Sequence, residues 1–174
     1  SVEFDNPSVG SASQAEIQIQ NTGNTSLTVG EPVITGEDSG NFSVLSGDRQ
    51  VRIAADSSQN ISVGFSPSAT GSITGTLQLE PRNDPTDTEG IREISLNGTG
   101  TSANAALNES AVSFGDISQG ETVNRSLTIR NDGTESLAVT GTSILGSDTD
   151  AFNVSGLGSP EIDAGDSETF TVEA

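Results

Sequence analysis

The side chains that most often perform catalysis are scarce in this sequence. It contains no His, Cys or Tyr, and all six of its basic residues are Arg, so that Lys is absent as well. The imidazole, thiol, phenol and amine groups that supply most general bases and activated nucleophiles are therefore missing, and a Ser-His-Asp arrangement cannot form. A pair of carboxylates would suffice to hydrolyse a glycosidic bond. However, without Trp or Tyr there is no aromatic platform for a sugar, and we predict neither an enzyme nor a cofactor.

Two acidic segments have the oxygen-rich composition that suits Ca²⁺. Residues 83–90 contain the carboxylates of Asp84, Asp87 and Glu89, and a second segment contains Asp148 and Asp150. Neither segment has the 12-residue ligand spacing of an EF-hand loop. A solvated loop explains both segments equally well, and we predict no metal site.

Sequons for N-glycosylation are more frequent than the composition requires. With 12 Asn and 45 Ser and Thr in 174 residues, chance would place roughly three Asn-x-Ser/Thr sequons in the chain. Seven occur, at Asn24, Asn41, Asn60, Asn97, Asn108, Asn124 and Asn153. Sequons are modified only in secreted chains, so these seven are candidate glycan sites of an extracellular protein. The alternative is a composition rich in Ser, Thr and Asn that carries no modification.

The charge of the chain is strongly negative and widely dispersed. Twenty-five acidic residues against six Arg give a formal net charge of −19. In molar salt the Debye length falls to about 3 Å, which screens the mutual repulsion of such a surface. A dispersed acidic surface without Lys therefore indicates adaptation to high salt, with an ordinary acidic surface protein as the alternative. Nucleic acid is not an expected partner, because no basic stripe is present to contact phosphates.

The elements that would position any site are short strands. Residues 17–29 and 127–139 both show apolar–polar alternation, then Asn-x-Gly, then a second alternating run. Alternation with a period of two is typical of half-buried strands. The Asn-x-Gly segment predicts a tight turn in which Asn and Gly occupy left-handed backbone conformations. We expect one strand on each side of the turn, over residues 15–20 and 26–34.

These two segments belong to an internal repeat. Residues 2–44 align with residues 112–154 without a gap, and fifteen of the 43 pairs are identical. A repeat of roughly 100 residues built only from strands is typical of an immunoglobulin-like sandwich. We therefore predict an all-β fold with two tandem immunoglobulin-like β-sandwiches, in residues 1–101 and 102–174. We expect the first strand of the second copy at residues 112–114.

The second copy stops after the residue that corresponds to Val63. Segments equivalent to residues 64–96 are missing, so the second sandwich is expected to lack its last strands within this chain. The first copy in turn lacks a lead-in like residues 103–110. An open sandwich exposes unpaired strand edges. We interpret the sequence as part of a longer array, or else a neighbouring chain supplies the missing strand.

Several segments resemble the Hydin-type, ASH-like immunoglobulin repeats, including those called choice-of-anchor D domains in prokaryotic surface proteins. They are V-S-F-G-D-I-S-Q-G-E-T at 112–122, N-D-G-T-E-S-L at 131–137, F-S-P-S-A-T-G at 65–71 and I-S-L-N-G-T-G at 94–100. The first copy departs from the pattern, because Asp5 and Asn6 stand where the second has Gly115 and Asp116. The resemblance implies a seven-stranded sandwich with a structural or binding role. It implies no enzymatic activity, since such folds host many functions.

Together these features predict a non-catalytic, extracellular structural or adhesive surface protein of a halophilic microbe, an archaeon in our interpretation. It would serve in a stalk, sheath, filament or adhesin, with neighbouring copies as protein partners and possible glycans. One alternative is a decoration, turret or tail-fibre module on the virion of a halophilic virus. Another is a carbohydrate- or protein-binding accessory module of a larger secreted protein. No run of 18 apolar residues is present, so no direct insertion into a membrane is expected from this segment.

Overall fold

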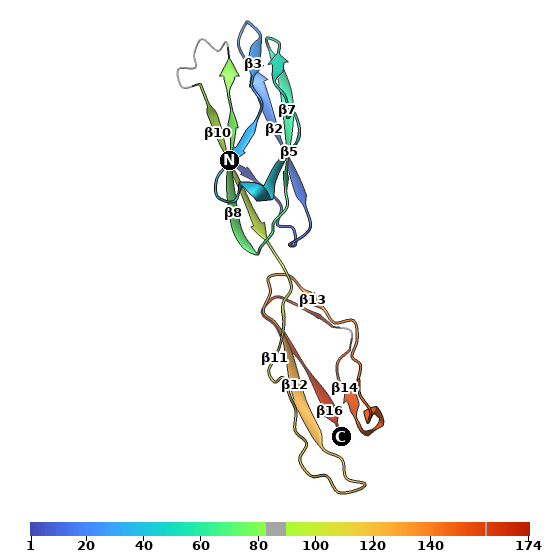
Figure 1. The fold of residues 1–174 in the computed structure, drawn as a ribbon. Coiled ribbons are helices and arrows are strands. Elements are labelled where there is room, and N and C mark those ends of the chain that lie inside the picture. Colours follow the sequence, from blue (N-terminus) through green and yellow to red (C-terminus); the bar gives the residue numbers. More distant parts are fainter. Residues whose placement is uncertain (83–89, 159) are drawn as a thin grey trace. The chain divides into compact units, whose positions relative to one another are not determined.

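The computed structural model describes residues 1–82, 90–158 and 160–174. It is an all-β structure, as predicted, and it divides into two compact units, Ser1–Thr101 and Ser102–Ala174 (Figure 1). No helix in the described part of the chain has the length and apolar character needed to cross a membrane.

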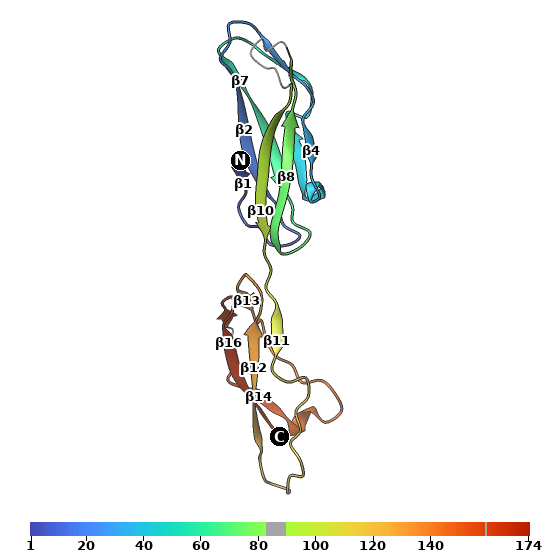
Figure 2. The same cartoon turned by 90° about the vertical axis from the view of Figure 1, so that its left-hand side faces the viewer.

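The first unit is built from two main sheets. One has the strand order β1 (Val2–Glu3), β10 (Arg92–Gly100), β8 (Gly71–Leu79) and β4 (Val33–Thr35), and its β1–β10 pair is parallel. The other has the order β2 (Ser13–Asn21), β7 (Ser57–Phe65) and β5 (Phe42–Ser46). A smaller sheet follows the order β6 (Val51–Ile53), β3 (Leu27–Val29) and β9 (Pro81–Arg82). Figure 2 shows β1, β10, β8 and β4 side by side.

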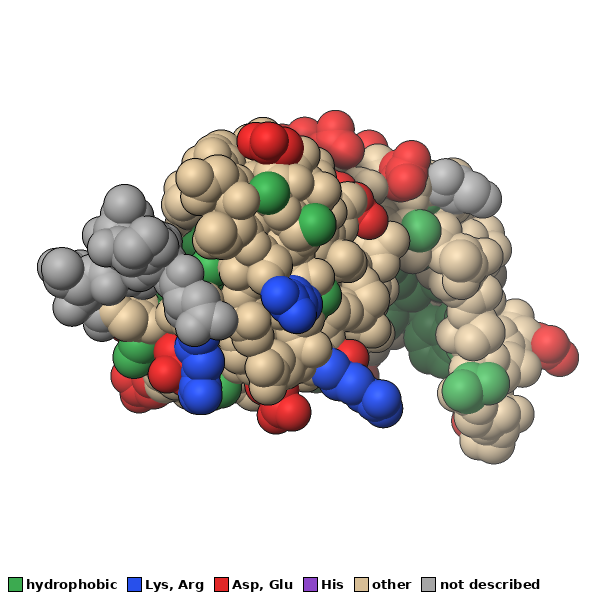
Figure 3. Space-filling model, turned by 90° about the horizontal axis from the view of Figure 1, so that it is seen from above, with side chains coloured by type: hydrophobic (Ala, Val, Ile, Leu, Met, Phe, Trp, Pro, Cys, Tyr) green, Lys and Arg blue, Asp and Glu red, His purple; other side chains and the backbone are tan. Residues whose placement is uncertain are grey.

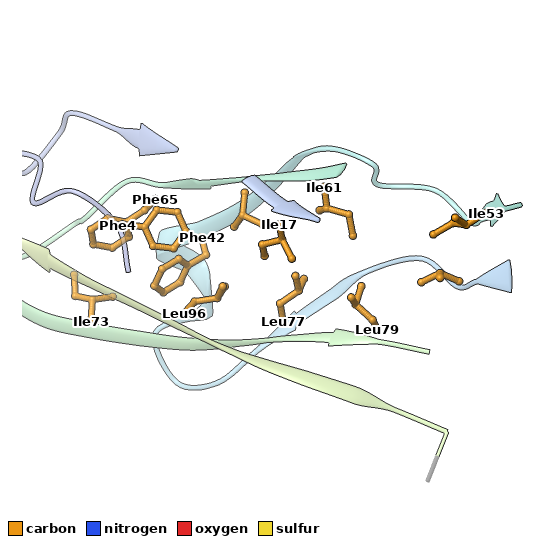
Figure 4. Close-up of a cluster of buried hydrophobic side chains, with 12 residues drawn as sticks. Phe4, Ile17, Phe42, Ile53, Ile61, Phe65, Ile73, Leu77, Leu79 and Leu96 are labelled. Atoms are coloured by element: carbon orange, nitrogen blue, oxygen red, sulfur yellow. The ribbon is translucent and has the colours of Figure 1, made fainter. Parts of the chain in front are cut away.

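The alternation of the sequence becomes the inner and outer faces of these sheets. Along β8, the side chains of Ile73, Leu77 and Leu79 are buried, while β7 contributes Ile61 and Val63 from the opposite sheet. Both sheets therefore supply side chains to one hydrophobic core (Figure 4). Burial of this apolar surface stabilises the layered arrangement.

Three Phe rings fill one end of the core of the first unit (Figure 4). Phe42 and Phe65 stack with ring centroids 5.0 Å apart, and Phe4 lies 5.6 Å and 5.5 Å from them in tilted arrangements. Gly98 on β10 faces this cluster, and a Cβ atom at that position would lie 2.6 Å from Cζ of Phe65. Position 98 on β10 therefore requires Gly, because the Phe65 ring lies too close for any side chain.

The second unit contains equivalents of β2, β3, η1 (Ser39–Asn41), β5, β6 and β7, but its residues equivalent to β1 and β4 form no strand. One sheet has the order β11 (Ala105–Leu107), β12 (Asn124–Asn131), β16 (Ser167–Glu173) and β14 (Asn153–Ser155). A small sheet pairs β13 (Leu137–Ala138) with β15 (Glu161–Ile162). The 3₁₀ helices η1 and η2 (Thr149–Ala151) occupy equivalent positions of the repeat. Among the described hydrophobic residues of this unit, only Leu127 and Ile162 are buried, and a complete second sandwich stays a prediction.

Two expected strands differ from the structure. The run at residues 26–34 is divided, because β3 joins β6 and β9 whereas β4 joins β8. Between them the Gly30 N–H donates to the carbonyl oxygen of Glu80. Residues 112–114 form no strand, although Phe114 contacts Phe152 with centroids 5.8 Å apart. In the second unit the strand before β12 is instead β11, which lies earlier in the chain.

Candidate interaction surface

A buried Asn organises the Asn-x-Gly segment of the first unit. Asn21 is 6% exposed, and its Nδ2 donates to the carbonyl oxygens of Thr25 at 2.8 Å, Ile53 at 3.0 Å and Ala54 at 3.0 Å. Its Oδ1 accepts the N–H of Gly23 at 3.0 Å. The side chain thus joins the end of β2 to the segment after β6. Buried polar groups are stable when they are paired in this way.

The second unit contains the same arrangement around Asn131, which is fully buried. Its Nδ2 donates to the carbonyl oxygens of Glu135 and Ile162. Its Oδ1 accepts two backbone N–H groups, from Gly133 at 3.0 Å and from Asn104 at 3.2 Å. The second of these bonds attaches the segment of β11 to the turn, and it has no counterpart among the described residues of the first unit.

The expectation of left-handed conformations at Asn-x-Gly is wrong. Asp56 is the only described residue other than Gly with a positive φ, and neither Gly23 nor Gly133 is among the positive-φ glycines. The contribution of Asn21 and Asn131 is instead the set of hydrogen bonds made by their side chains. Gly133 is required by space, because a Cβ atom there would clash with the Ser102 carbonyl oxygen and lie 2.6 Å from the Asn104 nitrogen. The strands on either side of the turn also do not pair with each other, because β2 pairs with β7 and β3 pairs with β6 and β9.

A cleft of about 310 Å³ opens between the sheets of the first unit. Its apolar walls come from both layers, with Ile17 and Ile19 on β2 facing Leu79 on β8 and Ile94 on β10. The remaining lining residues are Gln18, Gln20, Leu27, Val29, Pro81 and Arg92. Sequence reasoning placed all of these residues except Pro81 on strands. It did not find the cleft, because local sequence does not indicate which strand edges leave a gap between the sheets.

The cleft lies beside two incompletely paired strand edges. In the described structure β2 is the end strand of its sheet, so only its β7 side is paired. On β10, β1 pairs with Leu96 and Asn97, whereas near Ile94 the described residues provide a partner strand only on the β8 side. An unpaired edge presents backbone N–H and C=O groups that a further strand can bind. The cleft and these edges define the candidate interaction surface.

The structure separates the candidate glycan sites into two groups. Five of the seven candidate Asn residues are exposed, and three of these, Asn24, Asn124 and Asn153, make no side-chain hydrogen bond among the described residues. The remaining four take part in side-chain hydrogen bonds: Asn41 with Asp38 and Ser68, Asn60 with Glu16, Asn97 with Glu3, and Asn108 with Thr128. The Nδ2 atom that would carry the glycan donates to the Asp38 backbone carbonyl oxygen in Asn41, and to the carboxylates of Glu16 and Glu3 in Asn60 and Asn97. The candidate sites are spread over both units and are not gathered into one site.

The acidic residues form a solvated surface. No described Asp or Glu is buried, and Figure 3 shows acidic side chains distributed over the visible face. Two ion pairs, Arg82–Glu80 and Arg130–Asp132, are present in the described part of the chain. Asp148 and Asp150 belong to no group of three potential metal ligands among the described residues. Asp84, Asp87 and Glu89 lie outside the described residues.

The all-β fold with a core shared by two sheets is that of an immunoglobulin-like domain. Residues 1–101 match the family model described as Cep192 domain 4, and the chain belongs to this family. The resemblance to ASH-like immunoglobulin repeats is thereby confirmed.

Solved structures with similarity to the chain include the ASH/PapD-like domain 7 of human CEP192. It is 17% identical, with a TM-score of 0.43 over 57% of this chain and 79% of that one. A Porphyromonas gingivalis W83 protein of unknown function is also 17% identical, with a TM-score of 0.47 over 99% and 79% of the two chains. The CsuC–CsuE chaperone–tip subunit complex of Acinetobacter baumannii is 13% identical, with a TM-score of 0.40 over 95% and 83%. No curated protein sequence matches the chain. These similarities carry no argument about function.

Proposed function

We propose that the chain is a non-catalytic structural or adhesive module at the cell surface of a halophilic microbe, an archaeon in our interpretation. Its immunoglobulin-like units would act as rigid spacers or binding modules in a stalk, sheath, filament or adhesin. The family supports a binding or structural module. The extracellular location and the salt habitat rest on the surface chemistry of the chain.

The observation that carries the proposal is the solvated acidic surface without Lys. The chain has a formal charge of −19, no described carboxylate is buried, and the Arg residues of the two described ion pairs are largely exposed. Exposed pairs of this kind contribute at most about 1 kcal/mol each. They therefore offset little of the repulsion among the acidic side chains. Molar salt, in contrast, screens this repulsion over distances longer than about 3 Å.

The salt requirement can be measured on the chain itself. Circular dichroism and urea titrations would be recorded in 3 M KCl and again after dialysis into 50 mM KCl. We expect the β-sheet signal to weaken and the urea midpoint to fall at low salt, because the carboxylates then repel one another. An equally stable fold at both salt concentrations would refute the halophilic part of the proposal.

The location is tested on protein from the native source by intact mass and peptide mapping. Sugar on sequon peptides would support a secreted, glycosylated surface protein. Unmodified sequons on protein recovered from the cell interior would contradict the proposed location, while leaving the binding or structural role of the family unaffected.

A further inference from the structure

We propose that the first unit contains a mechanical clamp, formed by residues 2–9 and by residues 96–101 at the end of β10, which resists tension along the chain. The load enters from the N-terminal side of Val2 and leaves through Thr101, where the chain continues into the second unit. Bearing load is a further function, and it rests on the structural role proposed above. It requires neither the salt habitat nor the extracellular location.

The two segments of the clamp run parallel to each other. Val2 lies opposite Leu96 in the parallel register of β1 and β10. Glu3 lies opposite Asn97, whose carbonyl oxygen accepts the Phe4 N–H at 2.9 Å. Figure 2 shows β1 alongside β10. Within the described structure β10 is the only strand that pairs with β1, so this contact holds β1 in its sheet.

A second group of hydrogen bonds lies at the end of the first unit. The Thr101 N–H donates to the Pro7 carbonyl oxygen at 3.2 Å, and the Thr101 carbonyl oxygen accepts the Val9 N–H at 2.8 Å. Ser8 and Thr101 accordingly form a parallel bridge. Bonds from one residue to both neighbours of its partner are the normal pattern of parallel strands. The clamp therefore extends as far as the last residue of the unit.

Side chains reinforce the pairing of β1 with β10. Asn97 Nδ2 donates to Glu3 Oε1 at 2.6 Å. The ring of Phe4 is buried, and it packs against the rings of Phe42 and Phe65. The N-terminal segment therefore cannot slide along β10 unless the interstrand bonds break and Phe4 leaves the core.

The direction of the load determines how the bonds share it. Tension along the chain pulls residues 2–9 toward their N-terminal end and pulls β10 toward its C-terminal end. Because the two segments are parallel, these opposed pulls lie along the strands, whereas the interstrand bonds run between them. All bonds of the clamp are then strained at the same time. A pull across the strands would instead break them one after another.

The test is single-molecule force spectroscopy of the whole 174-residue chain in molar salt, first with a handle on each terminus. The length of chain released identifies the unit that unfolds, with at most about 360 Å for the first unit and about 260 Å for the second. The comparison geometry moves the N-terminal handle to Ser11→Cys, which is unique because the chain has no Cys. Tension then bypasses residues 2–9. At equal pulling speed we expect the first unit to unfold at no less than twice the force in the end-to-end geometry.

Val9→Pro removes one bond of the clamp and preserves the turn that contains it. The Ser11 N–H donates to the Ser8 carbonyl oxygen at 2.8 Å, and Gly10 has a φ of 88° whereas Val9 has no positive φ. These features define a type II turn with Val9 at its second position, where Pro is common. Pro lacks the N–H that binds the Thr101 carbonyl oxygen. At constant force the lifetime of the first unit should shorten at least tenfold in the end-to-end geometry, and less than threefold with the handle at position 11.

The matched control is Ala55→Pro, at the second position of another turn in the first unit. There the Ser57 N–H donates to the Ala54 carbonyl oxygen at 3.3 Å, and Asp56 has a φ of 54°. Since this turn lies outside the clamp, the substitution should shorten the lifetime less than threefold in both geometries.

Three results would each overturn the proposal. They are equal unfolding forces in the two geometries, an effect of Val9→Pro that is the same in both, and an effect of Ala55→Pro as large as that of Val9→Pro. The first comparison uses no substitution within the clamp, so it decides the question even if Val9→Pro does not fold. The structural role proposed above would survive such a result, because a spacer or binding module need not bear tension.

Discussion

The hydrogen bonds of Asn21 provide the sharpest test of how the first unit is held together. Asn21→Ala removes the donor for three carbonyl oxygens and the acceptor of the Gly23 N–H. The bond to Ile53 is buried and the other three are part-buried, so that water can replace them in part. With about 1–3 kcal/mol for the buried group left unpaired and about 0.5–1.5 kcal/mol for each of the three remaining bonds, we expect a loss of about 2.5–7.5 kcal/mol.

The substitution Asn21→Asp keeps the shape of the side chain but removes its hydrogen-bond donor. The carboxylate keeps an acceptor for Gly23 but turns its second oxygen toward the carbonyl oxygens of Thr25, Ile53 and Ala54, where the native amide donates. An ionised carboxylate has no donor to offer. At neutral pH this variant should therefore be destabilised at least as much as Asn21→Ala, although it is nearly isosteric with the native residue.

The measurement is denaturant unfolding in molar salt, read by hydrogen exchange of peptides from β2 and β3 so that the first unit is followed separately. Asn24→Ala, in the same turn but exposed, is the control and should change the free energy of unfolding by less than about 0.5 kcal/mol. Asn131→Ala should produce the corresponding loss in the second unit. A change below about 1 kcal/mol for Asn21→Ala, or a native-like Asn21→Asp, would refute this account.

Three further outcomes follow from the structure. Gly98→Ala should destabilise the first unit by about 1–3 kcal/mol or more, because the added methyl overlaps the Phe65 ring; denaturant unfolding checks this, and an unchanged midpoint would contradict the packing. Gly133→Ala should loosen the second unit, because the added methyl clashes with the Ser102 carbonyl oxygen. Hydrogen exchange of the β11 amides should become faster, and exchange as slow as in the native chain would argue against the clash. If the native protein is glycosylated, peptide mapping should find higher occupancy at exposed Asn24 than at Asn41, whose amide is engaged with Asp38; the reverse order would show that these hydrogen bonds do not limit modification.

Much of the fold was predictable because strand periodicity is a local property. The alternation at Ile73, Leu77 and Leu79 marks the inner face of β8 without knowledge of its neighbours. The gapless repeat likewise predicted that the two copies would share elements, and β2 and β12 do occupy equivalent residues. The same segments indicated the ASH-like resemblance, which the family match confirms.

Strand pairing was not predictable, because it joins residues that are far apart in the chain. β2 pairs with β7 and not with the strand that follows its turn, and β3 and β4 belong to different sheets. The role of Asn21 depends on carbonyl groups at Ile53 and Ala54, more than thirty residues away. Composition and periodicity contain no information about such partners.

By itself, the sequence determined the all-β class, the repeat, the acidic surface and the absence of the usual catalytic groups, since all of these follow from residue types and their spacing. Only the tertiary structure decided where the candidate interaction surface lies. The cleft lies beside β2, at the end of its sheet, and beside the part of β10 that precedes Leu96, where β1 pairs with Leu96 and Asn97. The edge of a sheet is a property of strand order, and strand order is established only when the whole unit has folded.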